Sequence, residues 1–303
     1  MNTNDSCLKY FFRMNNYHLY EEIGHGKLST VYKGRRRGTI EYVAIKSVDK
    51  SKRARVMTEV AMSASISSSP HLCHLLNWYE TRNHLWTVSE YCAGGDLSRI
   101  LKQDIKLPEL NVLAVGSQIL QGLLELHEAG IIFADMKPGN VLFVEDGSVK
   151  LSGFAVSQKI ADLESALAEN KPVPRRGSPF YMAPELFRDS GFHSFASDIW
   201  GLGIVLFEMI SGNTPFSACT SFQELQRTIT STRPVVSVDA CSASLSHLLS
   251  RMLDKDPSTR IGWHELVTHP WWNGTDLQNQ LVKIPQIESK FDKYFKPSPV
   301  IRE

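Results

Sequence analysis

A glycine-rich run near the start of the chain has the composition of a phosphate-binding turn. Residues 24–31 read Gly-His-Gly-Lys-Leu-Ser-Thr-Val and lie between two segments with the composition of β-strands. Because glycine has no side chain, the backbone of such a turn can approach a phosphate group closely. Glycine turns are also commonplace in β-hairpins, so this run taken alone is a weak indication of phosphate binding.

A lysine on the next strand strengthens the indication. Residues 43–46 read Val-Ala-Ile-Lys, which places the ammonium group of Lys46 beneath the glycine run. Glu59, on the helix expected to follow, is the predicted ion-pair partner of Lys46. A lysine on a strand is more often simply solvated. The glycine run, the lysine and the acid in this order nevertheless predict a site for a phosphorylated ligand.

The stretch Glu-Tyr-Cys-Ala-Gly-Gly-Asp at residues 90–96 suggests how a nucleotide could complete this ligand. The composition shifts here, from strand-like residues before Cys92 to long apolar helical patterns after it. Exposed backbone groups at such a boundary can bond the edge of an adenine ring, and Asp96 can reach a ribose hydroxyl. The alternative is a polar linker without a binding role.

The elements that would position these residues fall into two kinds. Strand-length segments rich in β-branched and aromatic residues are expected at 17–23, 29–36, 42–48, 75–79 and 85–91. Residues 53–65 have helical spacing, and from Leu110 onward apolar residues recur at helical intervals. The apolar run 199–210, followed by Gly212, predicts a buried helix. The pattern therefore predicts an α+β fold.

The composition excludes several classes of protein. The chain has 303 residues, 42% of them hydrophobic, and a net charge of +1 from 33 basic and 32 acidic residues. This near-neutral balance predicts neither nucleic-acid binding nor attraction to an anionic membrane. The five cysteines are scattered, and no apolar run is long enough to span a bilayer. We therefore expect free thiols, no membrane insertion and a cytoplasmic location.

Motifs further along the chain complete a recognisable set. Residues 135–140 read Asp-Met-Lys-Pro-Gly-Asn, residues 183–185 read Ala-Pro-Glu, residues 198–200 read Asp-Ile-Trp, and Arg260 follows. With these motifs the chain resembles the eukaryotic serine/threonine protein kinase domain. The resemblance implies a bilobal fold, with a small antiparallel N-lobe sheet carrying one main helix and a larger, mainly helical C-lobe. The expected divisions are an N-terminal extension (1–16), the N-lobe (17–91), the C-lobe (92–272) and a C-terminal tail (273–303).

Four short stretches of sequence narrow the resemblance to one branch of these kinases. The runs at residues 20–27, 32–35, 47–51 and 193–198 resemble the Runkel and Fused branch of the unc-51-like kinases. That branch is associated with cilia and microtubules and contains pseudokinases. The resemblance therefore implies a protein partner, such as an active kinase of the same machinery. It also implies a long helical-repeat region after the kinase domain, for which residues 273–303 are too few.

The resemblance implies a role for each matching residue. Asp135 would accept the proton of a substrate hydroxyl, Lys137 would steady the γ-phosphate of ATP, and Asn140 would hold a metal ion. The residues implied to contact ATP are Ile23, Gly24, Gly26, Lys27, Val31, Ala44, Lys46, Glu59, Ser89, Glu90, Cys92, Asp96, Asn140 and Leu142.

One position departs sharply from the family pattern. Residues 152–155 read Ser-Gly-Phe-Ala, so that Gly153 stands where kinases carry the aspartate that holds magnesium. Glycine offers no ligand atom, which leaves Asn140 as a weak protein ligand. Lysine side chains can still neutralise part of the charge of ATP. We therefore expect ATP binding without magnesium and weak or absent phosphotransfer, that is, a pseudokinase. The alternative is an active serine/threonine kinase with altered metal use.

Two further departures concern regulation and ligand shape. Ala134 replaces the arginine that usually pairs with a phosphate on the activation segment, the stretch from Gly153 to Glu185. This substitution predicts that phosphorylation of the segment is not the switch here. Ser89 is small where kinases often carry a bulky apolar residue, which predicts a back pocket that admits bulky ATP-competitive compounds.

Overall fold

The computed structural model describes residues 16–277 apart from 27–28, 67 and 232–240. The chain divides into two units. The first unit contains the residues up to Gly95 together with 142–155, and the second contains 96–141 and the residues from Val156 onward. The chain thus leaves the first unit after Gly95 and returns to it for a short stretch. No helix in the described ranges is long and apolar enough to cross a membrane.

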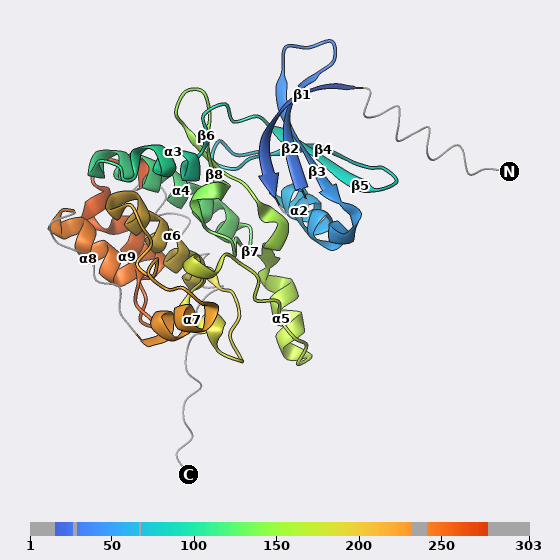
Figure 1. Cartoon of the computed structure of the whole chain (residues 1–303). Coiled ribbons are helices and arrows are strands. Elements are labelled where there is room, and N and C mark those ends of the chain that lie inside the picture. The colour runs from blue at the N-terminus through green and yellow to red at the C-terminus, as the bar shows by residue number, and fades with distance from the viewer. Residues whose placement is uncertain (1–15, 27–28, 67, 232–240, 278–303) are drawn as a thin grey trace. The chain divides into compact units, whose positions relative to one another are not determined.

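The first unit is built on an antiparallel sheet of five strands in the order β1-β2-β3-β5-β4 (Figure 1). The strands are β1 (Tyr17–Gly26), β2 (Ser29–Arg36), β3 (Tyr42–Asp49), β4 (Leu75–Glu80) and β5 (His84–Glu90). Each strand predicted from the sequence is present. The prediction was wrong about the glycine run, because Gly24 and Gly26 belong to β1 and pair with Val31 and Ser29 of β2. Only residues 27–28 separate the two strands.

The two faces of this sheet have different partners. Val43 and Ile45 of β3 point to one face, where they are buried with Tyr79 and Val88. Alternate residues of a strand point to opposite faces, so Ala44, Lys46 and Val48 share the other face. There the helix α2 (Arg53–Ser65) packs through Val56 on Val48 and Leu85. A short 3-10 turn (Lys50–Lys52) joins β3 to α2.

A hairpin formed by residues later in the chain adds to this unit. Strand β8 (Val141–Phe143) is followed by β9 (Val149–Leu151) and a 3-10 turn (Phe154–Val156). Leu151 donates its backbone N–H to His71 and accepts from Cys73. These bonds fix the hairpin to the chain that leads into β4. Gly153, two residues beyond β9, is thereby attached to the sheet with a φ of +87°.

The second unit is mainly helical. Its helices are α3 (Leu97–Asp104), α4 (Glu109–Glu128), α5 (Ile160–Ala168), α6 (Phe195–Ser211), α7 (Phe222–Ser231), α8 (Ala243–Met252) and α9 (Trp263–Thr268). Strands β7 (Ile131–Ile132) and β10 (Gln158–Lys159) pair antiparallel, and β6 (Gly95–Asp96) stands where the chain enters this unit. Short 3-10 helices lie at Pro138–Asn140, Pro179–Tyr181, Pro184–Phe187 and Pro270–Trp272. The antiparallel sheet of one unit and the helices of the other confirm the predicted α+β class.

Helix α6 forms the core of the second unit. It begins at Phe195, earlier than the predicted residue 199, because Ser194 and Ser197 form a reciprocal capping box. It ends at Gly212, as predicted, with that glycine in the left-handed conformation. Trp200 and Ile204 of this helix are buried with Leu225 and Ile229 of α7 and with Leu253. The largely apolar sequence of α6 is explained by burial on nearly every side.

Candidate functional site

In the first unit, the predicted phosphate-binding lysine forms the ion pair that the sequence suggested. The ammonium nitrogen of Lys46 lies 3.0 Å from Oε2 of Glu59 on α2, and 3.4 Å from Oε1. Both side chains are partly shielded from solvent, with exposed fractions of 31% for Lys46 and 14% for Glu59. The lysine is therefore held in place before any ligand arrives.

The strand register gathers other predicted nucleotide residues on the face of Lys46. Val31 pairs with Lys46, and Ala44 pairs with Ser89 of β5. Residues directly opposite in a sheet point to the same face, so these four side chains form one surface. Gly24 pairs with Val31 and leaves that edge of the surface open. A strand surface that carries small and branched side chains beside an ammonium group suits the flat base and the phosphates of a nucleotide.

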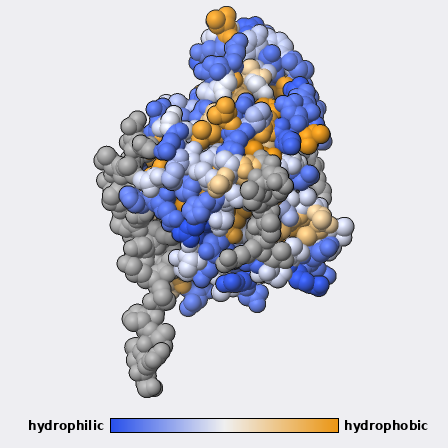
Figure 2. Space-filling model, turned by 90° about the vertical axis from the view of Figure 1, so that its left-hand side faces the viewer, coloured by the Kyte–Doolittle hydropathy of each residue, from blue (hydrophilic) through white to orange (hydrophobic). Residues whose placement is uncertain are grey.

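The remaining predicted ATP contacts of the first unit have varied surroundings. The carboxylate of Glu90, at the end of β5, lies 2.7 Å from the ammonium of Lys150 on β9. Cys92 is buried and its side chain interacts with Cys73, while Leu142 lies half-buried in β8. Ile23 is an apolar residue that remains 44% exposed. Exposed apolar residues are found elsewhere on the surface too, where Figure 2 shows them in separate patches among hydrophilic residues. Lys27 lies outside the described residues.

Asp96 has a structural function that the sequence did not indicate. It is the N-cap of α3, and its Oδ1 accepts from the backbone N–H of Arg99 at 2.9 Å. The same oxygen accepts from the hydroxyl of Ser98. A capping carboxylate of this kind stabilises the first turn of a helix. The other oxygen is the one that could meet a ribose hydroxyl, so the predicted role stays a prediction.

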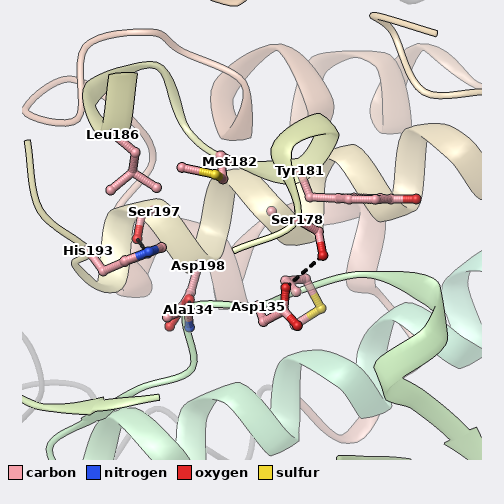
Figure 3. A pocket seen from close by; sticks show the side chains of 11 residues that line it. Ala134, Asp135, Ser178, Tyr181, Met182, Leu186, His193, Ser197 and Asp198 are labelled. Carbon is pink, nitrogen blue, oxygen red and sulfur yellow. Dashed lines mark hydrogen bonds between the residues drawn. The ribbon is translucent and has the colours of Figure 1, made fainter. Parts of the chain in front are cut away.

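In the second unit, the predicted catalytic residues lie together on one loop. The ammonium of Lys137 is 2.6 Å from Oδ2 of Asp135, and the side-chain nitrogen of Asn140 donates to the same carboxylate oxygen at 3.1 Å. Asn140 also donates to the carbonyl of Asp135 at 2.7 Å. The hydroxyl of Ser178, from the activation segment, donates to Oδ1 of Asp135 at 2.8 Å (Figure 3). Asp135 is thus oriented by three neighbours.

A buried network beneath this loop fixes its backbone. Asp198, which is 2% exposed, accepts from the backbone N–H groups of Phe133 at 2.7 Å and Ala134 at 2.8 Å. Its third donor is Nε2 of His127, at 2.8 Å. Trp263 donates to Nδ1 of His127 at 3.0 Å, so the proton of that ring is on Nε2. Ala134 adopts a positive φ of 67°, which an alanine avoids unless its surroundings hold it.

Burial keeps His127 neutral. Desolvation lowers the pKa of His127, and this effect outweighs the opposing influence of Asp198. A neutral ring with one proton can donate to Asp198 and accept from Trp263 at once, as the geometry requires. The Asp135 loop therefore rests on a network that does not change its charge near neutral pH.

A groove beside the catalytic loop could receive a peptide. It has a volume of about 460 Å³ and is lined in part by Lys102, Lys137, Ser178, Tyr181 and Glu208. The hydroxyl of Tyr181 donates to Glu208 at 2.7 Å. Burial raises the pKa of both groups, with the hydrogen bond to Glu208 adding to the rise for Tyr181. Sequence reasoning missed this pair, because the two residues are far apart in the chain and match no local motif.

The residues present do not fit a magnesium ion held in the usual way for this fold. Gly153 has no side chain, and its neighbour Ser152 has no carboxylate. The side-chain nitrogen of Asn140 donates to Asp135, and the amide of this residue carries no negative charge to offer a metal ion. Within the described ranges, no group of three or more His, Cys, Asp or Glu residues could hold a metal ion. Magnesium prefers carboxylate and phosphate oxygens, and here the phosphates would have to supply them.

Comparison with known proteins agrees with this geometry. The family model described as the protein kinase domain matches residues 17–272. Serine/threonine-protein kinase RUNKEL of Arabidopsis thaliana is 45% identical over 272 residues, which cover 90% of this chain and 19% of that protein. Serine/threonine-protein kinase ULK4 of Mus musculus is 36% identical over 282 residues, covering 86% of this chain and 22% of that protein.

A shorter relative is also similar. Serine/threonine-protein kinase ULK3 of Homo sapiens is 34% identical over 274 residues, covering 86% of this chain and 55% of that protein. The chain spans about a fifth of the length of the first two relatives. The matches confirm the predicted resemblance to the unc-51-like kinases.

Proposed function

Because this chain belongs to the protein kinase domain family, a family that binds ATP, we propose that it is a pseudokinase: it binds ATP and transfers the γ-phosphate weakly or not at all. The observation that carries the proposal is Gly153. Phosphoryl transfer depends on positioning and on neutralising charge with metal ions. A glycine at the principal metal position removes the ligand that would hold the bridging ion.

ATP binding does not require that ligand. The ion pair between Lys46 and Glu59 presents an ammonium group on the sheet face that carries Val31, Ala44 and Ser89. Lysine side chains bind phosphate oxygens through charge-assisted hydrogen bonds. Lys46 could therefore neutralise part of the charge of ATP in the absence of magnesium. We therefore propose, more specifically, that the protein binds ATP without magnesium.

Catalysis is more sensitive to the loss. A metal ion that bridges the phosphates contributes several kcal/mol to the stability of the transition state. Each ~1.4 kcal/mol corresponds to about a factor of ten in rate. Losing the principal ligand should therefore lower phosphotransfer by orders of magnitude.

One observation favours a second candidate, a slow serine/threonine protein kinase with altered metal use. Asp135, Lys137 and Asn140 keep a connected geometry, with Asp135 facing a hydroxyl group 2.8 Å away. An aspartate so placed can accept the proton of a substrate hydroxyl. Such a kinase would transfer the γ-phosphate to protein hydroxyls and would need magnesium held mainly by ATP itself.

A thermal-unfolding titration with ATP separates the two candidates. A ligand at about one hundred times its dissociation constant adds about 2.7 kcal/mol to stability. For a domain of this size that corresponds to a rise in melting temperature of about 5 °C. If the protein is a pseudokinase that binds ATP without metal, ATP should give the full rise in melting temperature in EDTA, and excess magnesium should leave that rise unchanged or reduce it. A rise that appears only with magnesium would favour the kinase. Absence of any rise would contradict both candidates.

The resemblance to the Runkel and Fused branch supports a biological setting. We place the protein in the cytoplasm, at cilia or microtubules, where its kinase fold would present a surface to a protein partner such as an active kinase. Because this chain spans only part of the length of its relatives, we propose this location for the full-length protein. Light microscopy of the full-length tagged protein tests it, and a distribution unrelated to cilia or microtubules would overturn it.

A further inference from the structure

Residues 174–178 of the activation segment are held one after another by contacts within the second unit. The carbonyl of Pro174 accepts from Nε2 of Gln158 at 2.9 Å, and the guanidinium of Arg175 donates to the carbonyl of Arg188. The hydroxyl of Ser178 reaches Asp135, as described above.

A further contact in this stretch comes from a buried histidine. Nε2 of His193 lies 2.8 Å from the carbonyl oxygen of Arg176, and His193 is 2% exposed. A carbonyl can only accept, so Nε2 carries the proton in this bond. Burial lowers the pKa of His193 despite the nearby carboxylates of Asp198, Glu185 and Asp135. The ring is therefore neutral near pH 7, with its proton on Nε2.

The position of His193 makes it a rigid anchor. It immediately precedes Ser194, the N-cap of the buried helix α6, and its Nδ1 faces the hydroxyl of Ser197 at 3.5 Å (Figure 3). The backbone on which the ring is mounted is fixed by the capping box of α6. A hydrogen bond from a fixed, desolvated donor is stronger than one that competes with water.

The space around this anchor has no room for a phosphate group. Gly177 packs so closely on the carbonyl oxygen of Ala134 that a Cβ atom on Gly177 would lie 3.1 Å from it. The cavity between Ala134, Ser178, His193 and Asp198 measures about 10 Å³. That is about the space of one water molecule. Position 134 carries no arginine that could bind a phosphate, and the activation segment already lies against the catalytic loop without one.

We infer that His193 is a positioning residue that holds the activation segment at the start of α6, beside the catalytic loop, through the carbonyl of Arg176. In this arrangement a neutral imidazole donor does what an arginine paired with a phosphate would otherwise do. The inference stands whether or not the protein transfers phosphate, since it concerns the order of residues 174–178.

Amide hydrogen exchange on the whole chain tests the inference. His193→Met fills most of the volume of the ring but has no donor, whereas the side-chain amide of His193→Gln can donate from a similar position. We expect His193→Met to raise the exchange rate of residues 174–181 about tenfold, since local opening is easier once the buried bond is lost. Exchange in α8 should stay unchanged, and His193→Gln should restore slow exchange in 174–181.

Control measurements keep the test decisive. His247→Met removes an exposed histidine of α8, one that contacts His269, and should leave exchange in 174–181 unchanged. Equal exchange of residues 174–181 in wild type and His193→Met would overturn the inference, as would equal effects of Met and Gln. If His193→Met does not fold, nitrogen-15 NMR of the wild-type histidines decides: the Nε2–H tautomer of His193 supports the anchor, and the Nδ1–H tautomer refutes it.

Discussion

The hydroxyl of Ser178 donates to Oδ1 of Asp135 at 2.8 Å and accepts from the ammonium of Lys137 at 3.0 Å. One serine of the activation segment thereby contacts both the carboxylate and the ammonium group of the catalytic loop. A phosphate on Ser178 would place negative charge directly against Asp135. The structure thus supports the hypothesis, drawn from Ala134, that phosphorylation of this segment is not an activating switch.

The contacts of Ser178 predict how its replacement should change the stability of the protein. Ser178→Asp should lower the free energy of unfolding by about 1–3 kcal/mol, because two carboxylates would meet and the hydrogen bond to Asp135 would be lost. Ser178→Thr keeps the hydroxyl and should stay close to wild type. Urea denaturation measures both variants. Equal stability of the Asp variant and wild type would contradict the expectation, and a strong change in its ATP affinity would argue against the hypothesis about phosphorylation.

Gly153→Asp should restore a ligand for magnesium. We expect ATP to stabilise this variant more in magnesium than in EDTA, and phosphotransfer to appear or rise sharply if the aspartate is the one missing part. The positive φ of 87° at Gly153 will cost some stability, although aspartate tolerates this region better than most residues. Gly153→Asn carries the same backbone cost without the charge and is the matched control. A magnesium effect of equal size in both variants would refute the role of the carboxylate.

Lys46→Met should remove the stabilisation that ATP gives. The ammonium that meets the phosphates would be lost, and Glu59 would be left without its partner 3.0 Å away. Lys50→Met is the control, since Lys50 also pairs with a carboxylate, that of Glu80 at 2.7 Å, but lies exposed on the turn after β3. Thermal shift with ATP compares the two. If the Lys46 variant still responded to ATP like wild type, the nucleotide would bind elsewhere.

The stability of the protein should fall as the pH drops below about 6.5. Burial lowers the pKa of both His127 and His193 in the folded state. An unfolded histidine titrates near pH 6.5, so below that value the unfolded chain takes up protons that the folded chain refuses. The stabilisation is complete above that pH and is lost on descending toward the folded pKa values.

Each buried histidine can contribute a slope of up to about 1.4 kcal/mol per pH unit. Urea denaturation between pH 7.5 and pH 5.5 measures the slope. His193→Gln should make it shallower, and replacing the exposed His264 by Gln should leave it unchanged. A slope that does not respond to His193→Gln would mean that this residue is not buried in its neutral form.

Local patterns in the sequence were enough to identify the elements and the family. Strand-length segments rich in β-branched and aromatic residues located the strands from β1 to β5, and Gly212 marked the end of α6, because these preferences act within a few residues. Ordered motifs identified Lys46, Glu59, Asp135, Lys137 and Asn140 as a set. The departures at Ala134 and Gly153 were visible as single residues within those motifs.

Only the tertiary structure decided which distant residues meet. The pairing of Tyr181 with Glu208, and the approach of His193 to the carbonyl of Arg176, join residues whose separation matches no periodic pattern. The tertiary structure also showed that Asp96 caps a helix and that Gly24 and Gly26 belong to β1 and pair with β2. Such contacts arise when buried polar groups must find partners in a packed core, a condition that depends on the whole chain rather than on its local sequence.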